Sequence, residues 1–243
     1  MRSPFFATTR WSLVLAAGDR SGHEAEAARA ALLETYWFPV YVSIRRRGHD
    51  GEAALDLTQG FFLHFLEKAL AGKADADRGR FRSFLRGCVD KYLLSERDRE
   101  GAARRGGGRV PVSIDAEGAE NRFALLDARA EDPARAFERA FAHSLLHRVI
   151  DRLAEEYMRK GRGDLCRELL AALFSDEDAS SQAAIARRTG MTEGAVKVAA
   201  FRLRDRLRRL LREEVEQTLA EPGKDLVEDE IRSLFSSVRG QTV

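Results

Sequence analysis

Residues 182–211 read QAAIARRTGMTEGAVKVAAFRLRDRLRRLL, and this stretch decides the fold that the sequence predicts. Two helical segments flank Gly190, where a tight turn favours the positive φ that glycine adopts without strain. Ala186 is small where the two helices must approach closely, and Val196 is apolar where the second helix packs back onto the first. The second helix then carries one apolar stripe at three- and four-residue spacing: Val196, Ala200, Leu203, Leu207 and Leu210.

The outward positions of this second helix are strongly basic. They carry Lys197, Arg202, Arg204, Arg206, Arg208 and Arg209. An apolar face and a basic face on a helix that follows a tight turn are typical of a helix-turn-helix, whose second helix enters a DNA groove. The alternative is an amphipathic surface helix with a solvated charged face. The spacing of Ala186 and Gly190 favours DNA binding.

The net charge of +2 hides a strong local asymmetry. Residues 78–109 contain ten Arg or Lys against four acids, and residues 181–212 contain nine against two. Acids gather instead in residues 115–138 and 213–230. Two separate basic blocks on a nearly neutral chain indicate two contacts with a polyanion.

The sequence predicts no metal, no cofactor and no membrane insertion. Its two cysteines, Cys88 and Cys166, lie in apolar helical patterns without CxxC spacing, and His143 and His147 lack a third ligand. The apolar runs are far shorter than the ~20 residues that span a bilayer. No signal-peptide pattern is visible at the N-terminus, so we expect a cytoplasmic protein.

No strand pattern stands out, so the chain is predicted to be all-α, with two small helical domains on a flexible linker. A first helix from about residue 24 should break or kink at Pro39 and resume to about residue 47. The glycine run at 106–108 and the polar, acidic residues after it predict the linker. The expected parts are a helical domain (1–100), the linker (101–132), a helix-turn-helix domain (133–214) and an acidic extension (215–243).

Two further segments carry recognisable patterns. DLTQGFFLHFLEK (56–68) combines an apolar face with acids and a glutamine, which suits docking to a basic coiled coil. GRFRSFLRGCVDKYLLSERDRE (79–100) interleaves aromatic and basic residues, as single-stranded DNA binding requires. With the helix-turn-helix, these segments resemble, in this order, the extracytoplasmic-function sigma factors of bacterial RNA polymerase. The resemblance covers about residues 26–99 and 137–212, and it implies a promoter-specificity subunit that is not an enzyme.

The resemblance also implies roles for individual residues. The first segment would bind the β′ clamp helices of core RNA polymerase through Asp56, Gln59, Phe62, Phe65 and Leu66; the alternative is an ordinary core helix. The second segment would read the minus-ten promoter element through Arg80, Arg82, Arg86, Lys91, Tyr92, Arg97 and Arg99. Phe81 and Phe84 of that segment could equally belong to the core, and for Phe84 the core is the favoured interpretation.

The helix-turn-helix would read the minus-thirty-five element. The side chains facing the major groove would be Lys197, Val198, Phe201 and Arg202. Thr192 would cap the recognition helix, which puts backbone N–H groups near a phosphate. Other phosphates would be held by Arg187, Arg188, Arg204 and Arg208. The chain departs from the family at Ala199 and Ala200, where relatives often carry a basic residue and a larger aliphatic one.

A second departure concerns the control of the protein. Leu55 and Gly60 stand where the family often has glutamate, so a phosphate on Thr58 would restore negative charge to this surface. Phosphorylation of Thr58 by a Ser/Thr kinase is therefore one hypothesis; the alternative is that Thr58 is an ordinary helix residue. An anti-sigma factor is another possible regulator. The acidic extension is expected to solvate the terminus; the alternative is that it folds back onto a basic domain and inhibits it.

Two other functions compete with the promoter-specificity subunit. A stand-alone helix-turn-helix regulator would bind a palindromic site as a dimer without polymerase, with residues 1–100 as its effector domain. The aromatic and basic residues of 79–100 argue against it, because a ligand pocket does not need that charge. A nucleic-acid enzyme would need clustered carboxylates, but Asp115, Glu117 and Glu120 lie in the predicted linker, and no P-loop or Rossmann glycines occur.

Overall fold

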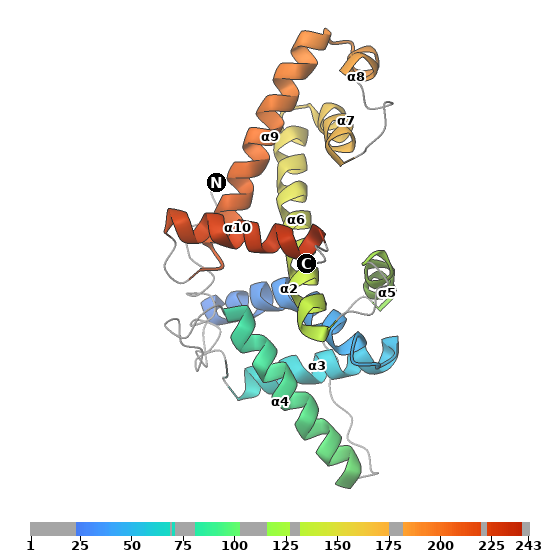
Figure 1. Ribbon diagram of the computed structural model, residues 1–243, viewed down its shortest axis with the longest axis vertical. Helices are drawn as coiled ribbons and strands as arrows, with labels where there is room; N and C mark the ends of the chain where they lie inside the picture. The colour runs from blue at the N-terminus through green and yellow to red at the C-terminus, as the bar shows by residue number, and fades with distance from the viewer. Residues whose placement is uncertain are drawn as a thin grey trace. The chain divides into compact units, whose positions relative to one another are not determined.

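The computed structural model describes residues 23–68, 70, 81–102, 116–126, 132–174, 182–219 and 223–239. Across these ranges the regular structure consists of α-helices with no strand, which confirms the predicted all-α class (Figure 1). The helices are α2 (His23–Arg45), α3 (Gly51–Glu67), α4 (Phe81–Ala102), α5 (Ala116–Leu125), α6 (Pro133–Met158), α7 (Gly163–Phe174), α8 (Gln182–Thr189), α9 (Glu193–Glu216) and α10 (Lys224–Arg239).

The chain divides into two compact units. The larger unit contains the helices up to Ser144 in α6 and the residues from Val215 onward, including α10. The smaller unit is Leu145–Glu214. The division therefore falls inside α6 and α9 and not in the linker that the sequence predicts. Phe137 and Phe141, in the part of α6 that belongs to the larger unit, are fully buried. Burial of these rings explains in part why the boundary falls inside α6.

The core of the larger unit is aromatic. α3 packs against α2, α4 and α5 (Figure 1). It contributes Phe61, Phe62 and Phe65, whose exposed fractions are 0–1%. The ring of Phe61 lies 5.1 Å from that of Phe62 and 5.6 Å from that of Phe65, in edge-on or tilted geometry. α3 begins at Asp50, whose carboxylate accepts a hydrogen bond from the Ala53 N–H at 2.8 Å.

Of the break or kink predicted at Pro39, a break is wrong, because α2 continues through this residue to Arg45. A proline inside a helix removes one backbone hydrogen bond and costs about 3 kcal/mol. Here the flanking residues Phe38, Val40 and Tyr41 are all buried. Burial of a large side chain contributes ~1.5–3 kcal/mol, so packing of this turn offsets the cost of the proline.

Part of the predicted linker is an anchored helix. Residues 116–125 form α5, and Glu120 accepts hydrogen bonds from Nε and Nη2 of Arg45 at 2.9 and 3.1 Å and from the Tyr41 hydroxyl. The Arg122 guanidinium lies 3.9 Å from the ring centroid of Phe38. These contacts join residues 75 and more positions apart, which is why local composition did not reveal them. Residues 101–102 of the expected linker end α4, and the rest of it, except residue 126 and Asp132, lies outside the described residues.

The acidic extension is not a solvated tail. Residues 224–239 form α10, which belongs to the larger unit. Val227, Glu230 and Leu234 are buried, with exposed fractions of 3%, 0% and 5%. Their spacing places them on one face of the helix. Residues 224–239 therefore pack back onto the larger unit, and inhibition by this segment stays a hypothesis.

The smaller unit contains the turn between α8 and α9 at Gly190. α8 ends at Thr189, Gly190 has a φ of +67°, and the N–H of Met191 donates to the carbonyl oxygen of Ala186 at 3.0 Å. The expected positive φ at Gly190 is thus confirmed. Ile185 of α8 and Val196 of α9 are both buried, with exposed fractions of 2% and 0%.

This geometry makes Gly190→Ala destabilising. A left-handed conformation costs an L-residue about 1–2 kcal/mol, so we expect the free energy of unfolding to fall by about 1 kcal/mol. Gly194→Ala is the matched control, because a Cβ at either glycine meets no atom within 4 Å and Gly194 is helical. It should leave the stability unchanged or raise it by up to about 1 kcal/mol. Urea unfolding of both variants measures the difference; equal losses would contradict the backbone argument.

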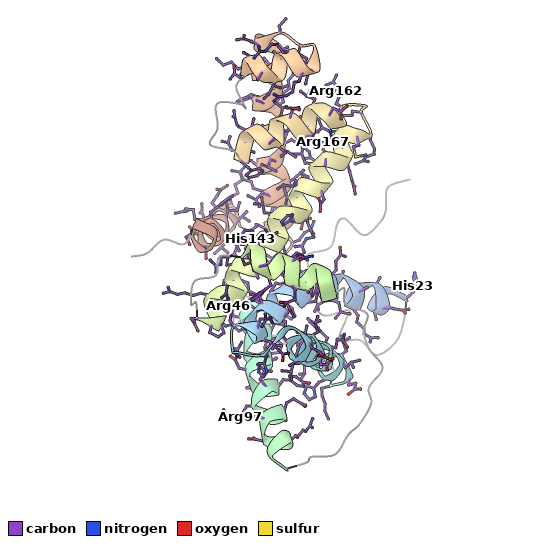
Figure 2. All side chains as sticks on the ribbon, turned by 90° about the vertical axis from the view of Figure 1, so that its right-hand side faces the viewer. His23, Arg46, Arg97, His143, Arg162 and Arg167 are labelled. Carbon is purple, nitrogen blue, oxygen red and sulfur yellow. The ribbon has the colours of Figure 1, made fainter. Side chains whose placement is uncertain are left out.

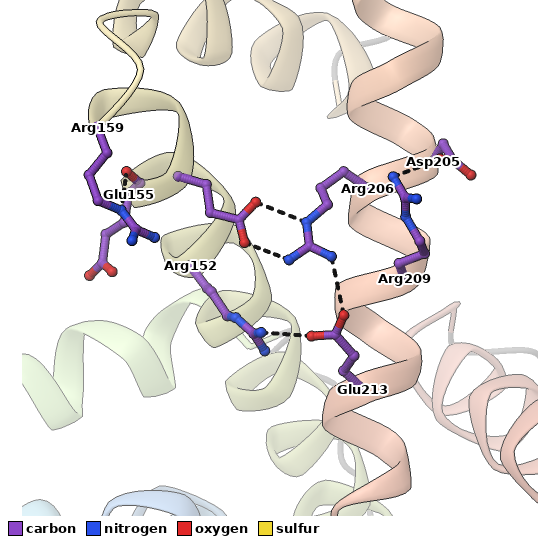
Figure 3. Close-up of polar contacts among 8 residues, drawn as sticks. Arg152, Glu155, Arg159, Asp205, Arg206, Arg209 and Glu213 are labelled. Atoms are coloured by element: carbon purple, nitrogen blue, oxygen red, sulfur yellow. Dashed lines mark hydrogen bonds and ion pairs between the residues drawn. The ribbon is translucent and has the colours of Figure 1, made fainter. Parts of the chain in front are cut away.

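An ion-pair network connects α6 to α9 within the smaller unit (Figure 3). Arg206 donates to both oxygens of Glu156 at 2.9 and 2.6 Å, and to Glu213 at 3.1 Å. Glu213 also pairs with Arg152 at 2.7 Å. The hydrogen bonds from Arg206 lower the pKa of Glu156, and those from Glu156 raise the pKa of Arg206. Arg206, which the sequence placed on the outward basic face, therefore has a structural role.

Candidate nucleic-acid interface

The first turns of α9 expose cations and apolar side chains together. Val198 and Phe201 have exposed fractions of 49% and 68%, and Lys197 and Arg202 are also exposed. On the other side of the helix, Val196 is fully buried. The four side chains that the sequence assigned to the major groove are thus all exposed and do not belong to the core of the smaller unit. A face with adjacent apolar and basic groups can contact both base edges and phosphates.

Thr192 caps this helix as the sequence predicted. Its Oγ1 accepts a hydrogen bond from the Ala195 N–H at 3.2 Å, and its carbonyl oxygen accepts one from the Val196 N–H at 3.0 Å. The remaining N–H groups of the first turn and the helix dipole favour an anion at this end.

Four further cations predicted to hold phosphates are exposed in the same unit. They are Arg187 and Arg188 of α8 and Arg204 and Arg208 of α9. Arg188 also pairs with Glu168 at 2.6 Å, so a phosphate would have to share it with that carboxylate. The exposed pair has a modest energy, which leaves Arg188 available to a polyanion.

The second basic segment, α4, divides into an exposed and a buried part. Lys91, Arg97 and Arg99 are exposed, together with Leu94, whose exposed fraction is 61%; Figure 2 labels Arg97 on this helix. Arg99 pairs with Glu96 at 2.8 Å one turn away. These side chains form an exposed, basic surface on the C-terminal half of α4.

Two of the predicted minus-ten residues are not on the surface. Arg82 has an exposed fraction of 3%, and its guanidinium donates to Glu138 at 2.5 Å and to Glu230. Burial by itself would lower the pKa of Arg82, but the two carboxylates outweigh burial and raise this pKa.

Tyr92 has an exposed fraction of 5%, and its ring packs 5.7 Å from that of Phe61. Arg86 is half-buried at 3.6 Å from Glu138, and Arg80 lies outside the described residues. Phe81 is buried and Phe84 half-buried, so the core alternative holds for Phe81.

The residues predicted to bind polymerase also divide between surface and core. Asp56 is exposed, and Gln59 and Leu66 are half-buried. Phe62 and Phe65 have exposed fractions of 1% and 0%, because the aromatic core requires them. A surface role for these two phenylalanines is therefore wrong. Leu63, which the sequence did not single out, is half-buried and follows Asp56 and Gln59 at helical spacing.

Thr58 cannot be the exposed phosphorylation site that the sequence suggested. It has an exposed fraction of 0%, and its hydroxyl donates to the carbonyl oxygen of Ala54 at 2.6 Å. A phosphate on this oxygen would place a charge of about −1.5 to −2 in the aromatic core. The alternative, an ordinary helix residue, describes Thr58 correctly.

Within the described ranges, His, Cys, Asp and Glu side chains do not gather in groups of three that could hold a metal ion. Cys166 is buried and Cys88 half-buried; both are free thiols, and burial raises the pKa of each. Among the helices described, none has the length and apolar character needed to cross a membrane. The chain matches no protein-family model, no curated protein and no solved structure.

Proposed function

We propose that this chain is a promoter-specificity subunit of bacterial RNA polymerase that resembles extracytoplasmic-function sigma factors and is not an enzyme. It binds core polymerase and directs transcription initiation at specific promoters. The observation that carries the proposal is the exposed face of α9, where Lys197, Val198, Phe201 and Arg202 follow a capped N-terminus. The exposed cations of α4 provide the second DNA contact that the resemblance implies.

The chemistry of the α9 face indicates what it reads in a major groove. Lys197 and Arg202 donate hydrogen bonds and therefore suit the guanine N7 and O6 acceptors. Val198 and Phe201 are apolar and therefore suit the C5-methyl groups of thymine. The arginines of α8 and α9 would hold the flanking phosphates, which fixes the helix in the groove without reading sequence.

Phe201→Ala is expected to weaken binding to a duplex selected from a random pool by about 1–3 kcal/mol, the energy of one good base contact. Replacing thymine by uracil in that duplex should weaken wild type and leave Phe201→Ala unaffected. Phe174→Ala is the matched control, because Phe174 is also exposed in the smaller unit, with an exposed fraction of 58%. Fluorescence anisotropy measures the affinities. An equal loss from Phe174→Ala would show that Phe201 does not contact bases.

The exposed side of α3 is the proposed contact with core polymerase. Asp56, Gln59, Leu63 and Leu66 combine one carboxylate, one amide and two partly exposed leucines. Such a surface complements a basic, amphipathic coiled coil, where charge steers the encounter and the leucines bury area.

Asp56→Lys tests this contact. Reversing the charge at the interface should raise the dissociation constant for purified core RNA polymerase about tenfold or more, mainly through slower association. Glu26→Lys, at an exposed position of α2, is the control with the same change of net charge. Surface plasmon resonance at two salt concentrations measures both rates. If the two reversals act alike, α3 is not the docking surface.

A further inference from the structure

The apolar face of α10 contains a carboxylate where a hydrophobic residue would be expected. Val227, Glu230 and Leu234 are buried, and Ile231 is half-buried. Glu230 lies in the middle of this stripe with an exposed fraction of 0%. Asp225 and Asp229 of the same helix are exposed. Glu230 is thus buried, whereas these other acidic residues of α10 are not.

Glu230 meets a cation from the distant helix α4. Its carboxylate accepts a hydrogen bond from Nη1 of Arg82, and Nε of Arg82 donates to Glu138 of α6. The Arg82 guanidinium also lies 5.4 Å from the ring centroid of Phe141. Arg82 is therefore held by two carboxylates and one aromatic face, all within the larger unit.

Folding alone does not require this arrangement. The desolvation of two charges cancels much of their attraction, so a buried ion pair stabilises a protein no better than apolar side chains of similar volume. What distinguishes the pair from an apolar contact is that another anion can compete for the cation. Arg82 lies in α4, the helix for which we propose the second DNA contact, and DNA phosphates are such anions.

We propose that α10 is an autoinhibitory element: Glu230 occupies Arg82 in place of a phosphate of single-stranded promoter DNA. α10 and the promoter strand then exclude each other at the N-terminal end of α4. This inference rests on the proposed function, because it needs α4 to bind DNA. Arg86 belongs to the same group of charged side chains, because its guanidinium lies 3.6 Å from Glu138, which also binds Arg82.

DNA can bind Arg82 only in molecules in which α10 has left it. The apparent DNA affinity is therefore the intrinsic affinity multiplied by the fraction of such molecules. Removing α10 should therefore tighten binding, and the gain should depend on Arg82. DNA should conversely release α10, because the two ligands of α4 are linked thermodynamically.

The test measures the affinity for a fluorescein-labelled single-stranded DNA of random sequence by anisotropy at about 50 mM salt. It compares the full chain, a chain ending at Leu219, Glu230→Gln and Asp229→Asn. Truncation and Glu230→Gln are each expected to tighten binding about tenfold or more. Asp229→Asn is the matched control, because this exposed neighbour pairs only locally with Arg232 at 2.6 Å. The gain from truncation should disappear when Arg82→Met is added.

The outcomes separate this inference from the proposed function. If the full chain binds the DNA and both Glu230→Gln and the truncated chain bind equally well, autoinhibition is wrong and the DNA-binding function stands. If truncation still tightens DNA binding in a chain that carries Arg82→Met, the inference is also overturned. If no variant binds single-stranded DNA, the DNA contact proposed for α4 fails and the inference fails with it, while polymerase binding and transcription still test the proposed function.

Hydrogen exchange of the full chain provides a test that does not depend on how the truncated chain folds. Addition of the same DNA should accelerate exchange of the α10 amides, while the amides of α3 keep their protection. Unchanged protection of α10 in a chain saturated with DNA would overturn the inference.

Discussion

Phe65→Ala is expected to lower the free energy of unfolding by about 3–5 kcal/mol, the usual cost of removing a buried aromatic ring. Phe65 has an exposed fraction of 0%, and its ring lies 5.6 Å from that of Phe61 and 6.5 Å from that of Phe81. Deleting it would leave a cavity among α3 and α4, which the packed rings cannot close. Denaturant unfolding followed by circular dichroism measures the loss.

The matched control is Leu66→Ala, the next residue along α3. Leu66 is half-buried, so less apolar area is lost and the expected cost is about 1 kcal/mol. Polymerase binding should show the opposite order when both variants are folded: Leu66→Ala weakens it directly, whereas Phe65→Ala acts only through stability. A stable Phe65→Ala protein that no longer binds polymerase would contradict this division between core and surface.

Arg82→Met should be as destabilising, at about 3–5 kcal/mol, because it leaves the buried Glu230 without its cation. The double variant Arg82→Met/Glu230→Leu should recover most of that loss, since two apolar side chains of similar size replace a buried ion pair. Arg86→Met is the control; Arg86 is half-buried and should cost less than about 1 kcal/mol.

A double-mutant cycle measured by urea unfolding tests this coupling. The losses in unfolding free energy of the two single variants, Arg82→Met and Glu230→Leu, should add up to more than the loss of the double variant. Additive losses would show that Arg82 and Glu230 do not depend on each other. The autoinhibitory role of α10 would then lose the contact on which it is built.

Local features of the chain were predictable because their causes lie within a few residues. The turn at Gly190, the cap at Thr192 and the buried position of Val196 all follow from helix periodicity and backbone sterics. The exposure of Phe201 follows from the same periodicity, because the apolar stripe of α9 fixes which face points outward. The all-α class likewise needs only the absence of an alternating pattern.

The wrong predictions share a different cause, which is a partner far away in the sequence. Arg82 was expected on an exposed basic surface, but it is buried here and pairs with Glu138 and Glu230, which lie 56 and 148 positions away. Glu120 was placed in a flexible linker, but Arg45, 75 positions away, anchors it. An arginine in a basic segment has the same local pattern whether it meets a phosphate or a buried carboxylate.

Thr58 and Phe65 illustrate a limit of family resemblance. A motif specifies which residue types occur along α3, but the side of the helix that each occupies follows from the packing of the larger unit. Phe61, Phe62 and Phe65 are buried, and Thr58 is buried with them. The exposed side then consists of Asp56 and its half-buried neighbours, and these are the residues to test for polymerase binding.

Promoter-dependent transcription with purified components tests the proposed function most directly. Core RNA polymerase alone, with the full chain, and with a Lys197→Ala/Arg202→Ala variant would each be given a duplex promoter pool, and initiated transcripts would be sequenced. The full chain should bind core polymerase and start transcription at promoters that share two elements, and the variant should lose most of this initiation. If the chain does not bind polymerase, and instead binds a palindromic duplex tightly as a dimer, it is a stand-alone regulator and the proposed function is wrong.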